Sequence, residues 1–417
     1  MVLFSNVSDC IFYFPSRFFH LISKSFRRTT MESKAPAQQF AGSSAGRSTI
    51  FSAPGRVNLI GEHTDYNDGF VMPSAIGLRT RVSISTRLDR RLMIRSEEFP
   101  QSFDFDLDDL PRHATGVWPD YVLGLAVALQ QAGHTLRGAN VFVQSEIPIG
   151  AGLSSSAAIE VASALALISL NGAAFPLAEV AKLCQHTENN FIGARVGIMD
   201  PFVSCLGRAG HALLLDCRSL EFEMIPIPDH VRMVVCNTMV KHQHAGGEYN
   251  QRRKECEEGV RILSKWYPNI RALRDLSLDR LAEHAKDLPE TIYKRCRHVV
   301  DENNRVQEGA SDLRAGDLES FGEGMRESHH SLRDLYEVSC RELDTMVEVA
   351  EGLSGFYGGR MTGGGFGGST INLVEAKDAQ SFAVQISDRY QKATGIKPAV
   401  YICSAADGAR VEANGAE

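Results

Sequence analysis

The sequence predicts a mixed α+β fold divided into two domains. Stretches typical of strands and of helices occur in both halves of the chain, a mixture that indicates α+β packing. The chain has 417 residues, enough for two or three cores of ordinary size. We therefore expect two α+β domains with a boundary near residues 220–235.

The first half contains both kinds of element in alternation. Residues 120–132 carry apolar side chains three and four apart, which predicts an amphipathic helix. Residues 155–170 are mostly apolar or small, with Glu160 the only charge, so we expect a buried helix there. The predicted strands are the β-branched and aromatic stretches 49–51, 81–86, 92–95 and 139–143.

The second half is richer in predicted helices. They lie at 247–266, 289–309, 318–332, 340–351 and 376–394, and strands are predicted at 370–374 and 399–402. From these elements we predict an N-terminal domain at 48–228, a C-terminal domain at 229–410 and a tail at 411–417.

Residues 1–47 are predicted to lie outside both domains, as a disordered leader or a mis-assigned start. The first 30 residues are aromatic and basic, and Pro15, Arg17 and His20 interrupt their apolar part. This composition makes a poor signal peptide, although an amphipathic transit peptide remains an alternative. If the start is mis-assigned, Met31 is the working start and the residues before it come from an over-extended reading frame. Residues 32–47 are rich in Ala, Gln, Ser and Gly, as disordered segments are.

Charge and cysteine content limit the class of protein. The formal net charge of -7 argues against wholesale binding of nucleic acid. The nine cysteines include no C-x-x-C pair, which favours reduced thiols in the cytoplasm over a disulfide framework or a structural zinc site. The sequence contains no run of 18 apolar residues, so it predicts no membrane-spanning helix. We expect no nucleic-acid, membrane or obligate protein partner.

The stretch around Gly150 has the arrangement of an anion-binding loop. A predicted strand, a glycine-serine loop and a predicted helix follow one another, so backbone N–H groups and a helix N-terminus would point at one anion. The residues that would line it are Gly150, Ala151, Gly152, Leu153, Ser154, Ser155 and Ser156. No lysine follows the second glycine, so this is not a Walker A loop. The alternative is a serine-capped helix after a tight turn.

A second cluster of polar residues lies within residues 55–69, GRVNLIGEHTDYNDG. Glu62, His63 and Asp65 fall within four residues, a density suited to binding several hydroxyls of a polyol. Arg56 is a fixed cation that could stabilise an alkoxide or a phosphoryl group in transfer. The alternative is a solvated turn.

Two further stretches, one in the second quarter of the chain and one in the last, carry residues suited to chemistry. Asp200 lies in the apolar setting 197–200, GIMD, with Glu188 upstream; such a carboxylate can act as a base, bind a metal or cap a helix. The glycine run 363–368 is expected to turn tightly or approach a ligand, with a flexible surface loop as the alternative.

Taken together, these stretches resemble the galactokinases, within the GHMP small-molecule kinases. The resemblance covers roughly residues 52–406, and its most specific part is 55–69, which looks like the galactokinase signature. The loop at Gly150 resembles the phosphate loop of the family, and 363–368 its third motif. It implies a two-domain GHMP fold, with a ribosomal-protein-like N-terminal domain and a ferredoxin-like C-terminal domain.

The resemblance also implies roles for matching residues. It implies transfer of the γ-phosphoryl of ATP to the C1 hydroxyl of galactose, with Asp200 as base beside Arg56. Ser156 and Glu188 would hold Mg²⁺, and residues 150–156 would wrap the ATP phosphates. The sugar would be bound by Glu62, His63, Thr64, Asp65, Gly197, Asp200 and Tyr249, and the nucleotide pocket would include Ser96 and Trp118.

The chain departs from the common galactokinase pattern at two positions. Val196 and Pro201 flank the GIMD motif where galactokinases commonly have Cys and Gln. Pro201 fixes φ and removes a backbone donor beside the expected base. Two other functions remain open: a kinase for N-acetylgalactosamine or another sugar, and a sensor that binds galactose and ATP without turnover.

Overall fold

The computed structural model describes residues 48–172, 174–241 and 245–412. The predicted leader therefore lies outside the described residues, whereas residues 411 and 412 of the predicted tail belong to a strand. Helices and strands occur in both halves, which confirms the α+β prediction. Among the described residues, no helix combines the length and apolar character needed to cross a membrane.

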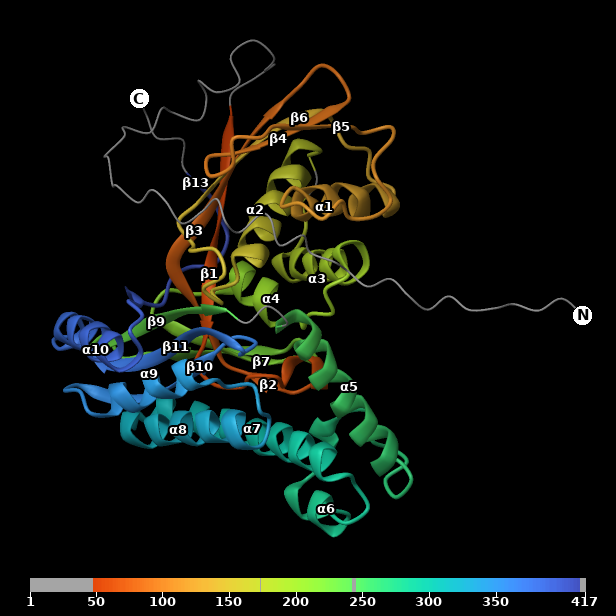
Figure 1. Ribbon diagram of the computed structural model, residues 1–417. Coiled ribbons are helices and arrows are strands. Elements are labelled where there is room, and N and C mark those ends of the chain that lie inside the picture. The colour runs from red at the N-terminus through yellow and green to blue at the C-terminus, as the bar shows by residue number, and fades with distance from the viewer. Residues whose placement is uncertain (1–47, 173, 242–244, 413–417) are drawn as a thin grey trace, which may run out of the picture.

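A six-stranded sheet forms the upper part of the molecule in Figure 1. Neighbouring strands are antiparallel except β4 and β6, which are parallel. In spatial order the strands are β13 (Arg410–Glu412), β1 (Thr49–Asn58), β3 (Pro73–Thr86), β6 (Ala139–Ser145), β4 (Arg91–Ser96) and β5 (Phe103–Asp106).

Helices of the first half cover one face of this sheet (Figure 1). They are α1 (Asp120–Gln131), α2 (Ser155–Leu170), α3 (Leu177–Thr187), the π-helical turn η4 (Glu188–Ile192) and α4 (Met199–Leu206). Helix α2 packs on β1 and β3, as expected of a buried helix. Its Ala157, Ala158 and Ala162 are fully or almost fully buried, because small side chains let a helix approach a sheet closely.

Two smaller sheets lie below the first in Figure 1. One has the order β10 (Phe356–Thr362), β11 (Gly367–Glu375), β9 (Val231–Lys241) and β12 (Ala399–Cys403). The other consists of β2 (Phe70–Val71), β7 (His211–Asp216) and β8 (Phe222–Pro226). Of these strands, only β11 and β12 correspond to predicted ones.

The remaining helices pack around these lower sheets. Helices α7 and α8 run side by side along the bottom of the molecule in Figure 1. The set comprises α5 (Ala245–Leu263), α6 (Leu278–Glu283), α7 (Glu290–Ala315), α8 (Leu318–Asp334), α9 (Arg341–Glu351), α10 (Ala379–Thr394) and the short 3₁₀ turns η3 (Asp65–Asn67) and η5 (Leu273–Asp275).

Strand β1 connects the two parts. It begins in the six-stranded sheet and ends at Asn58, whose N–H donates to the Thr362 hydroxyl at the end of β10, 3.2 Å away. The largest apolar core likewise includes side chains of both halves, such as Val57, Phe321 and Ile371. The turn that follows β1 therefore lies where the two parts meet.

Candidate active site

The loop between β6 and α2 has the backbone geometry expected of an anion-binding loop. Gly150 and Gly152 both have φ of 74°, a conformation that favours glycine. Ser154, the N-cap of α2, also has a positive φ of 57°. The loop is held from outside, because Arg56 N–H donates to the Leu153 carbonyl at 3.1 Å. The amides at the start of the 16-residue helix α2 are thus directed at one place.

Arg56 and Asp200 form a bidentate salt bridge beside this loop. Arg56 donates through Nε to Asp200 Oδ1 at 2.7 Å and through Nη2 to Oδ2 at 2.6 Å. Its Nη1 donates to the Gly152 carbonyl at 2.6 Å, and the Ser154 hydroxyl donates to Asp200 Oδ2. Arg56 is buried, but 30% of the Asp200 side chain is exposed. A ligand can therefore reach a carboxylate whose position is fixed by three hydrogen bonds, two from Arg56 and one from Ser154.

The glycine-rich stretch 363–368 contacts residues 59–69, which form the turn between β1 and β2, hereafter the signature turn. Gly363 N–H donates to Glu62 Oε1 at 2.7 Å, and the Thr362 hydroxyl donates to the same oxygen at 3.1 Å. A Cβ on Gly363 would lie 3.5 Å from the Gly152 carbonyl oxygen, so this stretch also borders the loop before α2. All three glycine-bearing stretches singled out in the sequence therefore meet in one place.

Thr64 closes the signature turn internally. Its fully buried hydroxyl lies 2.8 Å from the Gly61 carbonyl and 2.7 Å from the Phe70 carbonyl. The hydroxyl predicted to bind sugar is thus engaged by backbone groups, and the side chain stabilises the turn that carries Glu62, His63 and Asp65.

His63 lies in an aromatic cluster. The rings of Tyr66, Tyr249 and Tyr336 lie between 4.7 and 5.9 Å from it, measured between centroids. Nδ1 is 2.8 Å from the Tyr66 hydroxyl, whereas the buried Nε2 has no hydrogen-bond partner among the described residues. Burial lowers the pKa of His63 well below its usual value, so the ring is neutral and Nε2 can serve a ligand.

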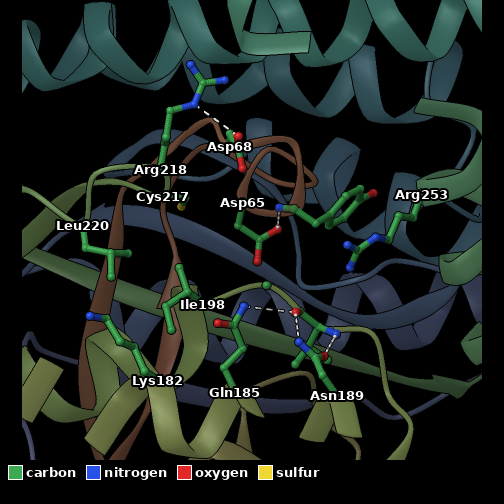
Figure 2. Close-up of a pocket in the computed structure, with 13 residues that line it drawn as sticks. Asp65, Asp68, Lys182, Gln185, Asn189, Ile198, Cys217, Arg218, Leu220 and Arg253 are labelled. Atoms are coloured by element: carbon green, nitrogen blue, oxygen red, sulfur yellow. Dashed lines mark hydrogen bonds and ion pairs between the residues drawn. The ribbon is translucent and has the colours of Figure 1, made fainter. Parts of the chain in front are cut away.

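Asp65 and Gly197 are in direct contact. A Cβ added to Gly197 would lie 1.7 Å from Asp65 Oδ2, so a larger residue there would displace the Asp65 side chain. Burial, with help from the neighbouring charge of Asp200, raises the pKa of Asp65 to about 7. The carboxyl group borders a pocket of about 370 Å³, shown in Figure 2, that also exposes Arg253, Lys182 and Gln185.

Glu188 is a further buried carboxylate, and it lies close enough to Asp200 for the two charges to interact. It is 7% exposed in η4 directly after α3, and the nearby Ser156 hydroxyl favours the charged form of its carboxylate. Burial, together with the charge of Asp200, raises the pKa of Glu188 to about 7. A cation between Ser156 and Glu188 would relieve this cost of charge burial.

Ser96 and Trp118 belong to the N-terminal half, at the end of β4 and just before α1. Ser96 ends β4 and pairs in register with Val143 of β6, the strand that leads into the loop. Trp118 precedes α1, stacks on Phe99 at 6.0 Å between ring centroids and meets Phe103 edge-on. Its Nε1 has no hydrogen-bond partner among the described residues. An aromatic ring with an unpartnered donor is a chemically suitable partner for a nucleotide base.

Comparison with known proteins identifies the family. The galactokinase galactose-binding signature matches residues 37–86, and the GHMP kinase N-terminal and C-terminal domains match 120–208 and 310–392. The galactokinases of Roseiflexus sp. (strain RS-1) and Chloroflexus aggregans are each 48% identical over 359 residues, covering 86% of this chain and 92% of theirs. The chain belongs to the galactokinase family. It is an ATP-dependent sugar kinase.

Solved structures agree with this assignment. The crystal structure of Lactococcus lactis galactokinase complexed with galactose superposes with a TM-score of 0.84 at 36% identity, covering 87% of this chain and 95% of that one. The Methanococcus jannaschii mevalonate kinase superposes with a TM-score of 0.61 at 18% identity, which shows the common fold alone. The predicted two-domain GHMP fold is thereby confirmed for this galactokinase.

The unusual proline of this galactokinase is accommodated by its place in α4. Pro201 is the third residue of the helix that begins at Met199. The first N–H groups of a helix have no intrahelical acceptor, so Pro201 removes no helical hydrogen bond beside Asp200. Val196, the other departure, lines the pocket next to Gly197, and its N–H donates to Asn189 Oδ1 at 2.8 Å.

Several residues that shape this site were not singled out in the sequence. They include Tyr66 and Tyr336 in the aromatic cluster and Thr362, Arg360 and Glu302 behind the signature turn. Tyr66 lies within the identified motif 55–69 and Thr362 directly precedes the run 363–368, so their place in the sequence could have suggested them. Glu302 follows Glu62 by 240 residues on an ordinary helix, and no local pattern marks it.

Proposed function

We propose that this galactokinase transfers the γ-phosphoryl group of ATP to the C1 hydroxyl of galactose, giving galactose 1-phosphate and ADP. The proposal is carried by one observation: Arg56 holds the Asp200 carboxylate beside the loop that precedes α2. A bond forms between O1 and the γ-phosphorus as the bond to the β-phosphate oxygen breaks. The proton of the hydroxyl passes to Asp200.

Arg56 and Asp200 have complementary roles in this proposal. The partly exposed Asp200 orients the C1 hydroxyl and accepts its proton. Arg56 holds the carboxylate through two hydrogen bonds and remains a fixed positive charge beside the reacting oxygens. The Ser154 hydroxyl donates a hydrogen bond to Asp200 and thereby connects the base to the phosphate loop.

The signature turn would bind the other hydroxyls of the sugar. Glu62 and Asp65 supply acceptors, and His63 supplies the unpartnered Nε2. Gly197 leaves room at the wall formed by Asp65, and Tyr249 closes the site from α5. Thr64 contributes through the turn that it stabilises.

We further propose that the nucleotide is bound by residues 150–156 with Mg²⁺ at Ser156 and Glu188. Among the described residues no group of three His, Cys, Asp or Glu side chains could hold a metal. One hydroxyl and one carboxylate suit Mg²⁺, which takes its other ligands from phosphates and water. When bound, the ion neutralises phosphate charge. Ser96 and Trp118 would contact the nucleoside, and loss of turnover with EDTA, reversed by Mg²⁺, tests the metal.

Mutation of the proposed base tests the function directly. We expect Asp200→Ala and Asp200→Asn to lower kcat with galactose and ATP by about 10²- to 10⁴-fold, the usual contribution of a general base. ADP release is measured by a coupled assay. The Asn variant keeps the shape of the site, and its melting temperature and galactose affinity serve as controls for folding. Exposed Asp229→Asn is the matched control. Turnover like that of the wild type in the Asn variant would remove Asp200 from this role.

A substrate panel separates the remaining alternatives. Activity confined to N-acetylgalactosamine would make the chain a kinase for the acetamido sugar, and binding of galactose and ATP without ADP release would make it a sensor. The presence of Arg56, Ser156, Glu188 and Asp200 in one site favours catalysis over sensing.

The domain limits 48–228 and 229–410 and a cytoplasmic location remain part of the proposal. Limited proteolysis would test the limits, and cell fractionation would test the location. The described cysteines are all free, as expected of reduced thiols.

A further inference from the structure

Helix α7 contacts the signature turn through one face. His298 and Glu302 are one helical turn apart, and Asn303 and Val306 continue the same face. The Asn303 side-chain oxygen accepts from Phe70 N–H at 2.8 Å, and a Cβ on Gly61 would lie 2.9 Å from Val306 Cγ2. The turn is thus fitted closely to a helix of the C-terminal half.

Glu62 is held by this helix through both of its backbone polar groups. Glu302 Oε1 accepts from Glu62 N–H at 3.3 Å and from Gly61 N–H at 2.9 Å. His298 Nε2 lies 3.2 Å from the Glu62 carbonyl, while its Nδ1 lies 2.8 Å from the Ser331 hydroxyl. Burial lowers the pKa of His298 to about 4, so the ring is neutral and donates from Nε2. The backbone of Glu62 is therefore fixed from one helix on both sides.

The Glu302 carboxylate is itself completely buried. Its Oε2 accepts from Arg305 Nε at 2.8 Å, and the Ser328 hydroxyl donates to Oε1 at 2.7 Å. Burial alone would raise the pKa of Glu302, but the charge of Arg305 and its other partners lower it to about 2. A buried charge is costly, and here its hydrogen bonds are directed to the turn that carries the sugar-binding side chains.

A second path leads from Glu302 to the side chain of Glu62. The Ser328 hydroxyl also accepts from Arg360 Nε at 3.1 Å. Arg360, fully buried, donates from Nη1 to the Asn58 carbonyl at 2.8 Å and lies 3.4 Å from Glu62 Oε1 through Nη2. With Thr362 and Gly363, Arg360 surrounds this one oxygen, and Oε2 belongs to the same immobilised carboxylate.

We propose that Glu302 is a positioning residue of the sugar site, which sets the orientation of Glu62 by accepting the N–H groups of Gly61 and Glu62. The inference rests on the proposed role of Glu62 in binding a sugar hydroxyl. Glu302 itself does not touch the substrate. Because Glu62 acts on the bound sugar and not on the transferred phosphoryl group, its displacement weakens galactose binding and leaves the transfer step largely unaltered.

Three substitutions distinguish acceptor position from charge. Glu302→Gln keeps an oxygen at the same distance from the backbone but loses the charge. Glu302→Asp keeps the charge but withdraws the acceptor by one methylene, and Glu302→Ala removes the acceptor. We expect the Ala and Asp variants to raise the KM for galactose by roughly 10-fold or more, the scale of effects from a misplaced binding group. The Gln variant should have the smallest effect of the three, because its amide oxygen still accepts both backbone bonds and only the bond from Arg305 Nε loses its acceptor.

The other kinetic constants serve as controls. The KM for ATP and kcat at saturating galactose should remain within about 2-fold of the wild type in all three variants. Glu308→Gln, at an exposed glutamate on the same helix, is the matched control. If the Ala variant does not fold, Ser328→Ala replaces it, because that change removes the hydroxyl shared by Glu302 and Arg360. Ser328→Ala should raise the KM for galactose, as Glu302→Ala does.

A series of monodeoxygalactoses links the effect to Glu62. The hydroxyl that Glu62 binds is first identified as the one whose removal makes Glu62→Gln harmless. Glu302→Asp should then also lose its effect on that analogue and keep its effect on the others. Equal effects on every analogue, or an Asp variant milder than the Gln variant, would overturn the inference. A wild type that fails to phosphorylate galactose would instead overturn the proposed function.

Discussion

The Asp65 carboxyl group shows how one buried residue can make the stability of the fold depend on pH. Burial and the nearby charge of Asp200 raise its pKa to about 7, from about 3.9 in an unfolded chain. The native state therefore binds more protons than the unfolded state between these values. The stability associated with protonated Asp65 is fully present below pH 4 and is lost as the pH rises through 7.

We therefore expect Asp65→Asn to stabilise the ligand-free protein increasingly with pH. The amide cannot ionise, and its oxygen can keep the bond from Tyr66 N–H, now 2.9 Å long. The difference in melting temperature between variant and wild type should grow from pH 5 to pH 8. Asp229→Asn, at an exposed position, is the control. A difference that does not change with pH would mean that Asp65 titrates as an ordinary surface carboxyl.

At the scale of elements, the contact between α8 and β10 depends on glycine. A Cβ on Gly322 would lie 2.1 Å from the Tyr357 carbonyl oxygen, whereas one on Gly324 would find only Ile60 Cδ1, 3.9 Å away. Gly322→Ala should lower the free energy of unfolding by about 2–3 kcal/mol through overpacking. Gly324→Ala should raise it by about 0.5–1 kcal/mol through helix propensity.

Urea denaturation of the two variants measures this difference, and each serves as the control for the other. Both glycines lie inside α8, so helix propensity contributes equally to both changes. If both variants were stabilised alike, α8 would not be packed on β10 as closely as described.

Helices with strong periodicity were predictable from the sequence, and short elements were not. The predicted helices 120–132, 155–170 and 318–332 correspond to α1, α2 and α8 within two residues at each end. Helix α4 has only eight residues and contains Pro201, which is compatible with a helix only because it lies in the first turn. Strand β9 reads as an apolar run, and its role as the strand between β11 and β12 depends on partners more than 120 residues away.

At the scale of the whole molecule, the motifs were predictable but the structure that supports them was not. Residues 55–69, 150–156 and 363–368 were each recognisable from local composition, and the fold brings all three together. Glu302 and Arg360 hold this site from behind. In the sequence a lone glutamate or arginine indicates a solvated surface, and only the tertiary structure shows that these charges are buried.

The C-terminal segment is part of the N-terminal sheet, and Arg79 holds it there. Strand β13 pairs with β1, and the buried Arg79 donates to the carbonyls of Asp407 at 2.8 Å and Gly408 at 2.7 Å and to the Ser52 hydroxyl at 3.1 Å. Asp407 and Gly408 follow Arg79 in the sequence by 328 and 329 residues. The six-stranded sheet is therefore completed only when the last described residues are in place.

We expect Arg79→Ala to lower the free energy of unfolding by about 3 kcal/mol, because it leaves buried carbonyl oxygens without donors. Hydrogen exchange should accelerate at residues 405–412 and in β1, while β9 and β11 keep their protection, since the lower sheet makes no use of Arg79. Arg410→Ala, which removes a half-exposed guanidinium from β13, is the control and should change stability by less than about 0.5 kcal/mol. An Arg79→Ala variant with unchanged exchange in both segments would show that strand pairing alone retains β13, and that the buried guanidinium adds nothing to the closure of the sheet.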